Sequence, residues 1–240
     1  MNFKEIFRSI NDLPNKCYLC GEHETKLEQD HLPPKCIFPR EYWSLLIQVP
    51  ICKRCHDKRN KDDEYFRDYL SIWCGKNVPK EIHQKRQKSW EERVSHKIAT
   101  LKNLIPVWVE LRSGLTIPGY ALKGEMNRIN PVLECIARGH YFSYKEVTIP
   151  ESKIRILLTK APFIDGSNDS SVRFLSKLPV LQEVVPGMFK FKSNNFREGE
   201  TNISNWLLEF YDTIQFFIQF SWIEKRINSY TATFPKVDIS

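Results

Sequence analysis

The spacing of apolar residues changes along the chain, from a helical period in the first half to mixed periods in the second. After Cys55, large apolar side chains recur every three or four positions, as on one face of an α-helix: Tyr65, Phe66, Tyr69, Leu70 and Trp73. The same period continues between Lys76 and Lys102, where its apolar members are Ile82, Trp90, Val94, Ile98 and Leu101. The pattern predicts two helical regions in the first half.

The second half combines strand-like alternation with one helical stretch. Residues 124–138 have helical spacing that continues across Pro131. Alternation typical of strands occurs in five segments: 107–111, 154–158, 189–191, 206–211 and 214–220. The last two flank Asp212-Thr213, which predicts a β-hairpin. This order of elements predicts an antiparallel α+β region.

Composition places the chain among folded proteins without a membrane segment. It has 240 residues, of which 41% are hydrophobic, so one large or two small domains with a buried core are expected. No run approaches the roughly 18 consecutive apolar residues that a membrane-spanning helix needs. The chain opens without a charged and apolar signal segment, and we therefore expect a cytoplasmic location.

Positive charge is concentrated in one predicted helix. The net charge is +7, and the segment from Lys76 to Lys102 carries eight Lys or Arg residues against three Asp or Glu residues. An amphipathic helix with a basic outer face can bind a phosphate backbone without reading its sequence. The alternative is an ordinary solvated surface. The residues of this helix that we expect to contact nucleic acid are Lys85, Arg86, Lys88 and Arg93.

Four of the seven cysteines form two Cys-x-x-Cys pairs, Cys17 with Cys20 and Cys52 with Cys55. Two such pairs supply the four thiolates of a closed, tetrahedral structural zinc site. Disulfides are the alternative, but the odd number of cysteines and the expected reducing compartment argue against them. The three other cysteines are expected to be small buried residues: Cys36, Cys74 and Cys135.

A second group of ligand-type residues lies between and just after the cysteine pairs. Asp30 and His31 are adjacent, so on a strand they point to opposite sides, one toward a metal and one toward water. His56 follows Cys55 directly, and Asn60 lies four residues later on the same helix face. We predict an open divalent-metal site with His31 as a base. Lys35 is a candidate phosphate contact, with an ordinary surface lysine as the alternative.

Residues 14–72 resemble the HNH endonucleases, in particular their zinc-knuckled branch. The resemblance is carried by three segments: Asp30-His31-Leu32-Pro33-Pro34-Lys35, Val49-Pro50-Ile51-Cys52 and Asp62-Asp63-Glu64-Tyr65-Phe66. It implies a ββα-metal core in which His31 is the general base. It also implies that Asp30 and His56 hold a catalytic Mg²⁺, Mn²⁺ or Ni²⁺ ion. In that family a middle asparagine steadies the loop that carries the base, and the stretch 44–48 of this chain has none. Either Ser44 or Gln48 substitutes for it, or backbone contacts alone hold the base.

Together these observations predict an α+β protein with three parts. Residues 1–75 form an HNH nuclease domain with zinc knuckles, residues 76–105 a basic connecting helix, and residues 106–240 an α+β domain. We predict a metal-dependent endonuclease that acts on DNA, or alternatively on RNA, in a restriction or anti-phage setting. The alternative is a non-catalytic zinc-knuckle nucleic-acid-binding or scaffold protein with a degenerate fold. Residues 106–240 are expected to form a homodimer surface or to bind a regulatory protein partner.

Overall fold

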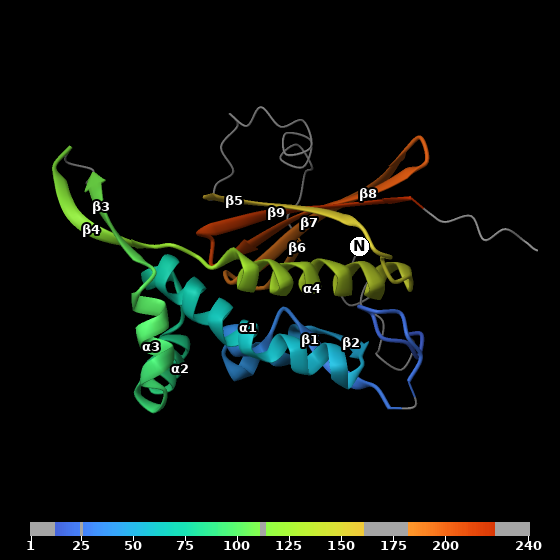
Figure 1. Ribbon diagram of the computed structural model, residues 1–240, viewed down its shortest axis with the longest axis horizontal. Helices are drawn as coiled ribbons and strands as arrows, with labels where there is room; N and C mark the ends of the chain where they lie inside the picture. Colours follow the sequence, from blue (N-terminus) through green and yellow to red (C-terminus); the bar gives the residue numbers. More distant parts are fainter. Residues whose placement is uncertain (1–12, 25, 111–113, 161–181, 224–240) are drawn as a thin grey trace, which may run out of the picture.

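The computed structural model describes residues 13–24, 26–110, 114–160 and 182–223, which form four α-helices and nine strands in mixed α+β order (Figure 1). In chain order these elements are β1 (Glu28–Leu32), β2 (Ile47–Ile51), α1 (Lys53–Trp73), α2 (Lys80–Glu92), α3 (Val94–Leu101), β3 (Leu104–Glu110), β4 (Thr116–Leu122), α4 (Met126–Lys145), β5 (Lys153–Lys160), β6 (Gln182–Val185), β7 (Phe189–Glu198), β8 (Thr201–Phe210) and β9 (Ile214–Ile223). None of the described helices is long and apolar enough to cross a bilayer. The predicted α+β class is confirmed.

The first two strands and the first helix form a ββα unit. β1 and β2 pair antiparallel with Asp30 opposite Val49, and α1 begins directly after β2, with Cys52 at its N-cap. Two short 3₁₀ helices, η3 (Lys35–Ile37) and η4 (Arg40–Leu45), connect the strands. The apolar residues predicted for α1 lie on its inner side, where Phe66 and Leu70 are fully buried. The helical spacing after Cys55 was therefore a correct prediction.

A five-stranded antiparallel sheet forms the other side of the molecule. Its strand order is β5-β9-β8-β7-β6, and α4 lies between this sheet and the ββα unit (Figure 1). The predicted helix 124–138 is the first part of α4, which includes Pro131. The predicted hairpin is β8–β9, and its turn residues Tyr211 and Asp212 adopt positive φ.

One hydrophobic core extends through both halves of the chain. Leu32 and Phe66 of the ββα unit belong to the same buried cluster as Ile136 of α4 and Phe216 of the sheet. Fully burying a side chain of this size contributes roughly 1.5–3 kcal/mol. The predicted boundaries at residues 75 and 105 therefore do not divide the core.

The predicted basic helix is two helices. α2 ends at Glu92, Arg93 adopts φ −132° and ψ 78°, and α3 begins at Val94. β3 follows from Leu104, and the predicted strand residue Leu111 lies outside the described residues. β3 pairs with β4 as a two-stranded hairpin away from the main sheet (Figure 1). Trp108 and Tyr120 on this hairpin are 74% and 75% exposed.

At Gly139 the backbone of α4 lies close against the ββα unit. A Cβ atom at this position would lie 1.9 Å from Leu32 Cδ1 and 3.3 Å from Tyr18 Cε2. Both neighbours are fully buried and cannot move freely. Only glycine lets the helix backbone lie this close to β1. Gly139 lies inside α4, which continues to Lys145.

We predict that Gly139→Ala lowers the melting temperature. Overpacking of a dense core costs about 1–3 kcal/mol, more than the roughly 0.5–1 kcal/mol that alanine gains over glycine inside a helix. Differential scanning calorimetry would measure the loss. Leu32→Val removes the clashing Cδ1 atom, so in that background Gly139→Ala should cost clearly less. An equal loss in both backgrounds would show that the contact is not the cause.

Candidate metal centre and catalytic cleft

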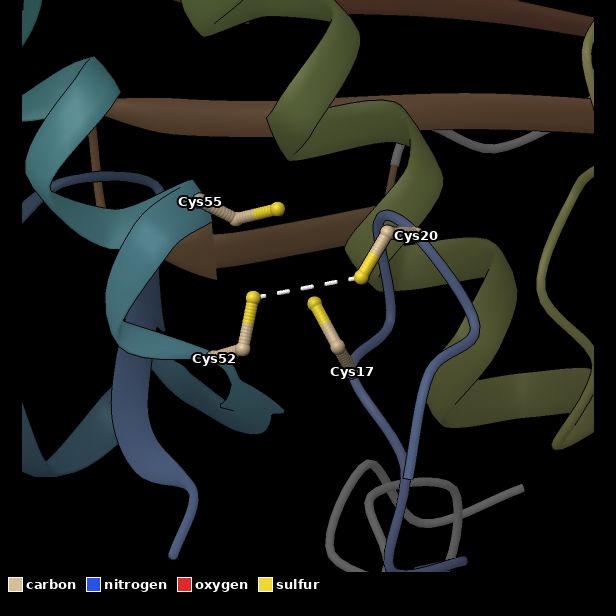
Figure 2. Close-up of side chains that lie close together, drawn as sticks. All are labelled: Cys17, Cys20, Cys52 and Cys55. Atoms are coloured by element: carbon tan, nitrogen blue, oxygen red, sulfur yellow. Dashed lines mark hydrogen bonds between the residues drawn. The ribbon is translucent and has the colours of Figure 1, made fainter. Parts of the chain in front are cut away.

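The two cysteine pairs converge on one point (Figure 2). The Sγ atoms of Cys17, Cys20, Cys52 and Cys55 all lie within 4.8 Å of one another, and Cys20 Sγ is 3.9 Å from Cys52 Sγ. Zinc bound at about 2.3 Å by four sulfurs in a tetrahedron places those sulfurs about 3.8 Å apart. All four thiols are free rather than oxidised. The soft donor set and its size fit the predicted structural zinc.

Local backbone geometry brings the thiols together. Gly21 has φ +75°, and its N–H donates to the Cys17 carbonyl at 2.8 Å, which closes a tight turn around the first pair. The second pair begins at the N-cap of α1 and ends in its first turn. Burial raises the pKa of the Cys17 thiol, so the thiolate form requires a nearby cation. A bound metal supplies that charge.

A cleft of about 410 Å³ lies beside this centre and brings together four of the predicted functional residues. Asp30, His31 and Lys35 line it from β1 and the segment that follows, and His56 lines it from α1. Burial, and secondarily the charge of Lys35, lowers the pKa of His31. His31 is therefore neutral at physiological pH, which is the protonation state that a general base requires.

Asp30 has partners that the sequence did not predict. Its side chain is buried, and Arg59 of α1 donates to it through Nη1 and Nη2, each at 2.5 Å. Tyr18 OH donates to Oδ2 at 2.7 Å. The Asp30 carboxylate is thus already bonded within the protein, and its role as a metal ligand stays a prediction. These bonds fill three of the four acceptor positions of the carboxylate, and the remaining one is on Oδ1.

Arg59 also contacts a second carboxylate, Asp63, with 3.2 Å between Arg59 Nε and the nearer oxygen. Burial raises the pKa of Asp63 to about 7, although the charge of Arg59 opposes this shift. Asp30 receives two bonds of 2.5 Å from Arg59, shorter than the contact with Asp63, and is the main counter-ion of Arg59.

His56 has a carboxylate partner as well. Its Nδ1 atom lies 2.7 Å from Glu28 Oε2. If Nδ1 carries the proton in this bond, Nε2 presents its lone pair, which is the arrangement of a metal-bound histidine with an orienting carboxylate. Sequence reasoning missed Glu28. The available signal was its place two residues before Asp30, which puts both side chains on the same face of β1. The side chain of Asn60 lies outside the part of the molecule that the structure describes, so its role as a second ligand stays a prediction.

The stretch 44–48, which lacks the family's middle asparagine, includes a residue opposite the predicted base His31. Gln48 of β2 pairs with His31 of β1 in the antiparallel register. Side chains at paired positions project to the same face of a hairpin. Ser44 lies on η4 instead. Of the two predicted substitutes, Gln48 has the better placement.

Most of the predicted basic contacts are tied to the protein itself. Arg86 donates to Ser71 Oγ at 2.9 Å, and burial lowers its pKa. Arg93 pairs with Glu64 at 2.9 Å. Lys88 is exposed and lies 3.8 Å from Glu92, and Lys85 pairs with Glu81 at 2.8 Å. The helix pair therefore does not present a continuous open row of basic side chains.

Comparison with protein-family models, curated proteins and solved structures gives no significant match. The resemblance of residues 14–72 to the HNH endonucleases consequently remains a prediction from the sequence motifs. The site must be interpreted from its own residues.

We predict that Cys17→Ser abolishes zinc binding and unfolds the ββα unit. The metal site holds the knuckle loop against α1, and a structural zinc supplies much of the folding free energy of a small unit. Zinc content by atomic absorption and near-ultraviolet circular dichroism would report the two effects. Cys74→Ala is the matched control, because Cys74 is a buried cysteine outside the cluster. Full zinc content in Cys17→Ser would contradict the assignment.

Proposed function

We propose that this protein is a metal-dependent endonuclease that hydrolyses phosphodiester bonds in DNA, with RNA as the alternative substrate. The observation that carries the proposal is the meeting of Asp30, His31, Lys35 and His56 around one cleft. The cleft lies in a ββα unit beside a four-cysteine centre. This arrangement is the one that the resemblance to the HNH endonucleases implies.

In the proposed reaction, neutral His31 accepts a proton from the attacking water. Lys35 binds a non-bridging phosphate oxygen and keeps the backbone at the cleft. His56, through Nε2, and Asp30, through the open position on Oδ1, would hold a divalent ion. Such an ion stabilises the negative charge that develops on the leaving oxygen.

Arg59 and Tyr18 have a defined part in this proposal. Carboxylates that bind metals are usually held by further hydrogen bonds, which fix their orientation. Arg59 and Tyr18 hold Asp30 in this way, and Glu28 does the same for His56. The charge of Arg59 weakens the attraction of Asp30 for a cation, so we expect a divalent-ion affinity lower than that of an unpaired carboxylate.

One observation favours a second function. The bidentate bond between Arg59 and Asp30 neutralises the only acidic residue predicted to bind the catalytic ion. If this bond persists in the presence of divalent ions, the cleft would bind nucleic acid without cleaving it. The protein would then be a zinc-knuckle nucleic-acid-binding or scaffold protein with a degenerate nuclease fold.

We predict that the protein nicks supercoiled plasmid in the presence of Mg²⁺ or Mn²⁺, and that His31→Ala lowers the rate about 10²–10⁴-fold, the usual contribution of a general base. His56→Ala should raise the concentration of divalent ion needed for half-maximal rate while zinc content stays unchanged. Agarose gels of nicked and linear products would measure these rates.

His23→Ala is the matched control, because His23 is exposed and bonds only the Asn15 carbonyl among the described contacts. Its rate should equal that of the wild type. If His31→Ala nicks plasmid at the wild-type rate, His31 is not the base. Binding of DNA without cleavage under Mg²⁺, Mn²⁺ and Ni²⁺ would favour the second function.

A further inference from the structure

Three cationic side chains gather around the indole ring of Trp43. Lys35 Nζ lies 5.0 Å from the ring centroid, Lys85 Nζ 5.7 Å and Arg40 Cζ 5.7 Å. They come from three elements: Lys35 from η3, Arg40 from η4 and Lys85 from α2. We refer to Lys35, Arg40, Trp43 and Lys85 as the Trp43 cluster. The segment 35–43 and the helix α2 thus meet at one point on the surface.

The ring at the centre of the Trp43 cluster is fixed in place. Trp43 Nε1 donates to the Lys35 carbonyl at 3.1 Å and to the Phe38 carbonyl at 3.2 Å. Its π-face attracts cations by about 0.5–1 kcal/mol each at exposed sites. This attraction offsets part of the repulsion among the three positive charges and holds them close together.

The positive charge of the cluster is mostly uncompensated. Lys85 pairs with Glu81 at 2.8 Å. Within the described part of the chain, neither Lys35 nor Arg40 forms an ion pair with a carboxylate. Arg40 is exposed, and Lys35 and Lys85 are half-buried. Three cations with one acidic partner leave an excess of positive charge, which can bind an anion.

The cluster adjoins the catalytic cleft. Lys35 belongs to both, because it lines the cleft with His31 and also contacts Trp43. A chain of phosphates that enters the cleft therefore passes the cluster within the reach of one lysine side chain. Arg86 and Arg93, which were predicted to bind phosphate, instead bond to α1.

From this geometry we infer that the Trp43 cluster is a backbone-phosphate site, which binds a phosphate of the polynucleotide next to the one held in the cleft. The inference rests on the proposed function for the nature of the polymer. It deepens that function by giving the path of the strand over η3, η4 and the start of α2. The cations bind the phosphate oxygens, and Trp43 sets their spacing without contacting a base.

The test compares salt dependence of DNA binding in two charge-matched pairs of variants. Fluorescence anisotropy with a labelled duplex would be measured in a His31→Ala background, so that the duplex is not cleaved. Lys35→Gln with Arg40→Gln should reduce the slope of log K against log salt by about 1.8, since each lost contact with duplex DNA removes about 0.9. Lys76→Gln with Lys97→Gln removes the same charge from exposed lysines outside the cluster and should leave the slope unchanged.

Trp43→Leu provides a second readout, because it removes the ring without changing the net charge. Binding should weaken in this variant, provided that its zinc content confirms a folded ββα unit. An unchanged slope in the Lys35/Arg40 pair, or an equal decrease in both pairs, would overturn the inference, and an unchanged slope would also remove the phosphate contact proposed for Lys35. The proposed roles of His31, Asp30 and His56 would stand in either case. If the His31→Ala protein binds neither DNA nor RNA at low salt, the inference and the proposed function both fail.

Discussion

The buried ion pair between Arg59 and Asp30 is the contact on which the arrangement of the ββα unit depends. It joins β1 to α1, and through Tyr18 it also fixes the knuckle loop that carries the first cysteine pair. Taking both charges out of water costs several kcal/mol for each ion, which is offset only when their hydrogen bonds are satisfied. Here the guanidinium bonds Asp30, Asp63 and Tyr18. Removing either partner would leave an unpaired buried charge, so the pair specifies one packing of these segments.

The same contact governs the chemistry that we propose for the cleft. Asp30 can contribute to a metal site through one remaining acceptor position, and Arg59 reduces the negative charge available there. His56 is less constrained, because Glu28 holds only Nδ1, and His56 lines the cleft. The affinity for a divalent ion is therefore expected to depend on how far Arg59 relaxes.

The sequence predicted the parts of the structure that have strong local signals. Two Cys-x-x-Cys pairs predicted the thiol cluster, because the motif restricts both the ligands and the loop that presents them. Helical spacing predicted α1, and the apolar segments around Asp212 predicted the β8–β9 hairpin. The break at Arg93 was missed, since the apolar period continues through it.

Partners distant in sequence could not be predicted in the same way. The bond between Arg59 and Asp30 spans 29 positions, and the cation cluster around Trp43 joins residues up to 50 apart in the chain. Neither contact follows from a local period. The shared core could not be predicted for the same reason: α4 buries residues against both β1 and the sheet, and no local pattern indicates which surfaces a helix will join.

The central position of α4 has a consequence for the modularity of the cleft. A ββα unit with its own complete core could fold alone and function when joined to other proteins. Here the residue after His31 packs against Gly139 of α4, more than 100 positions later in the chain. The ββα unit cannot be excised at residue 75 without exposing Leu32 and Tyr18 to water. The segment that carries His31 therefore depends for its packing on the C-terminal half of the chain.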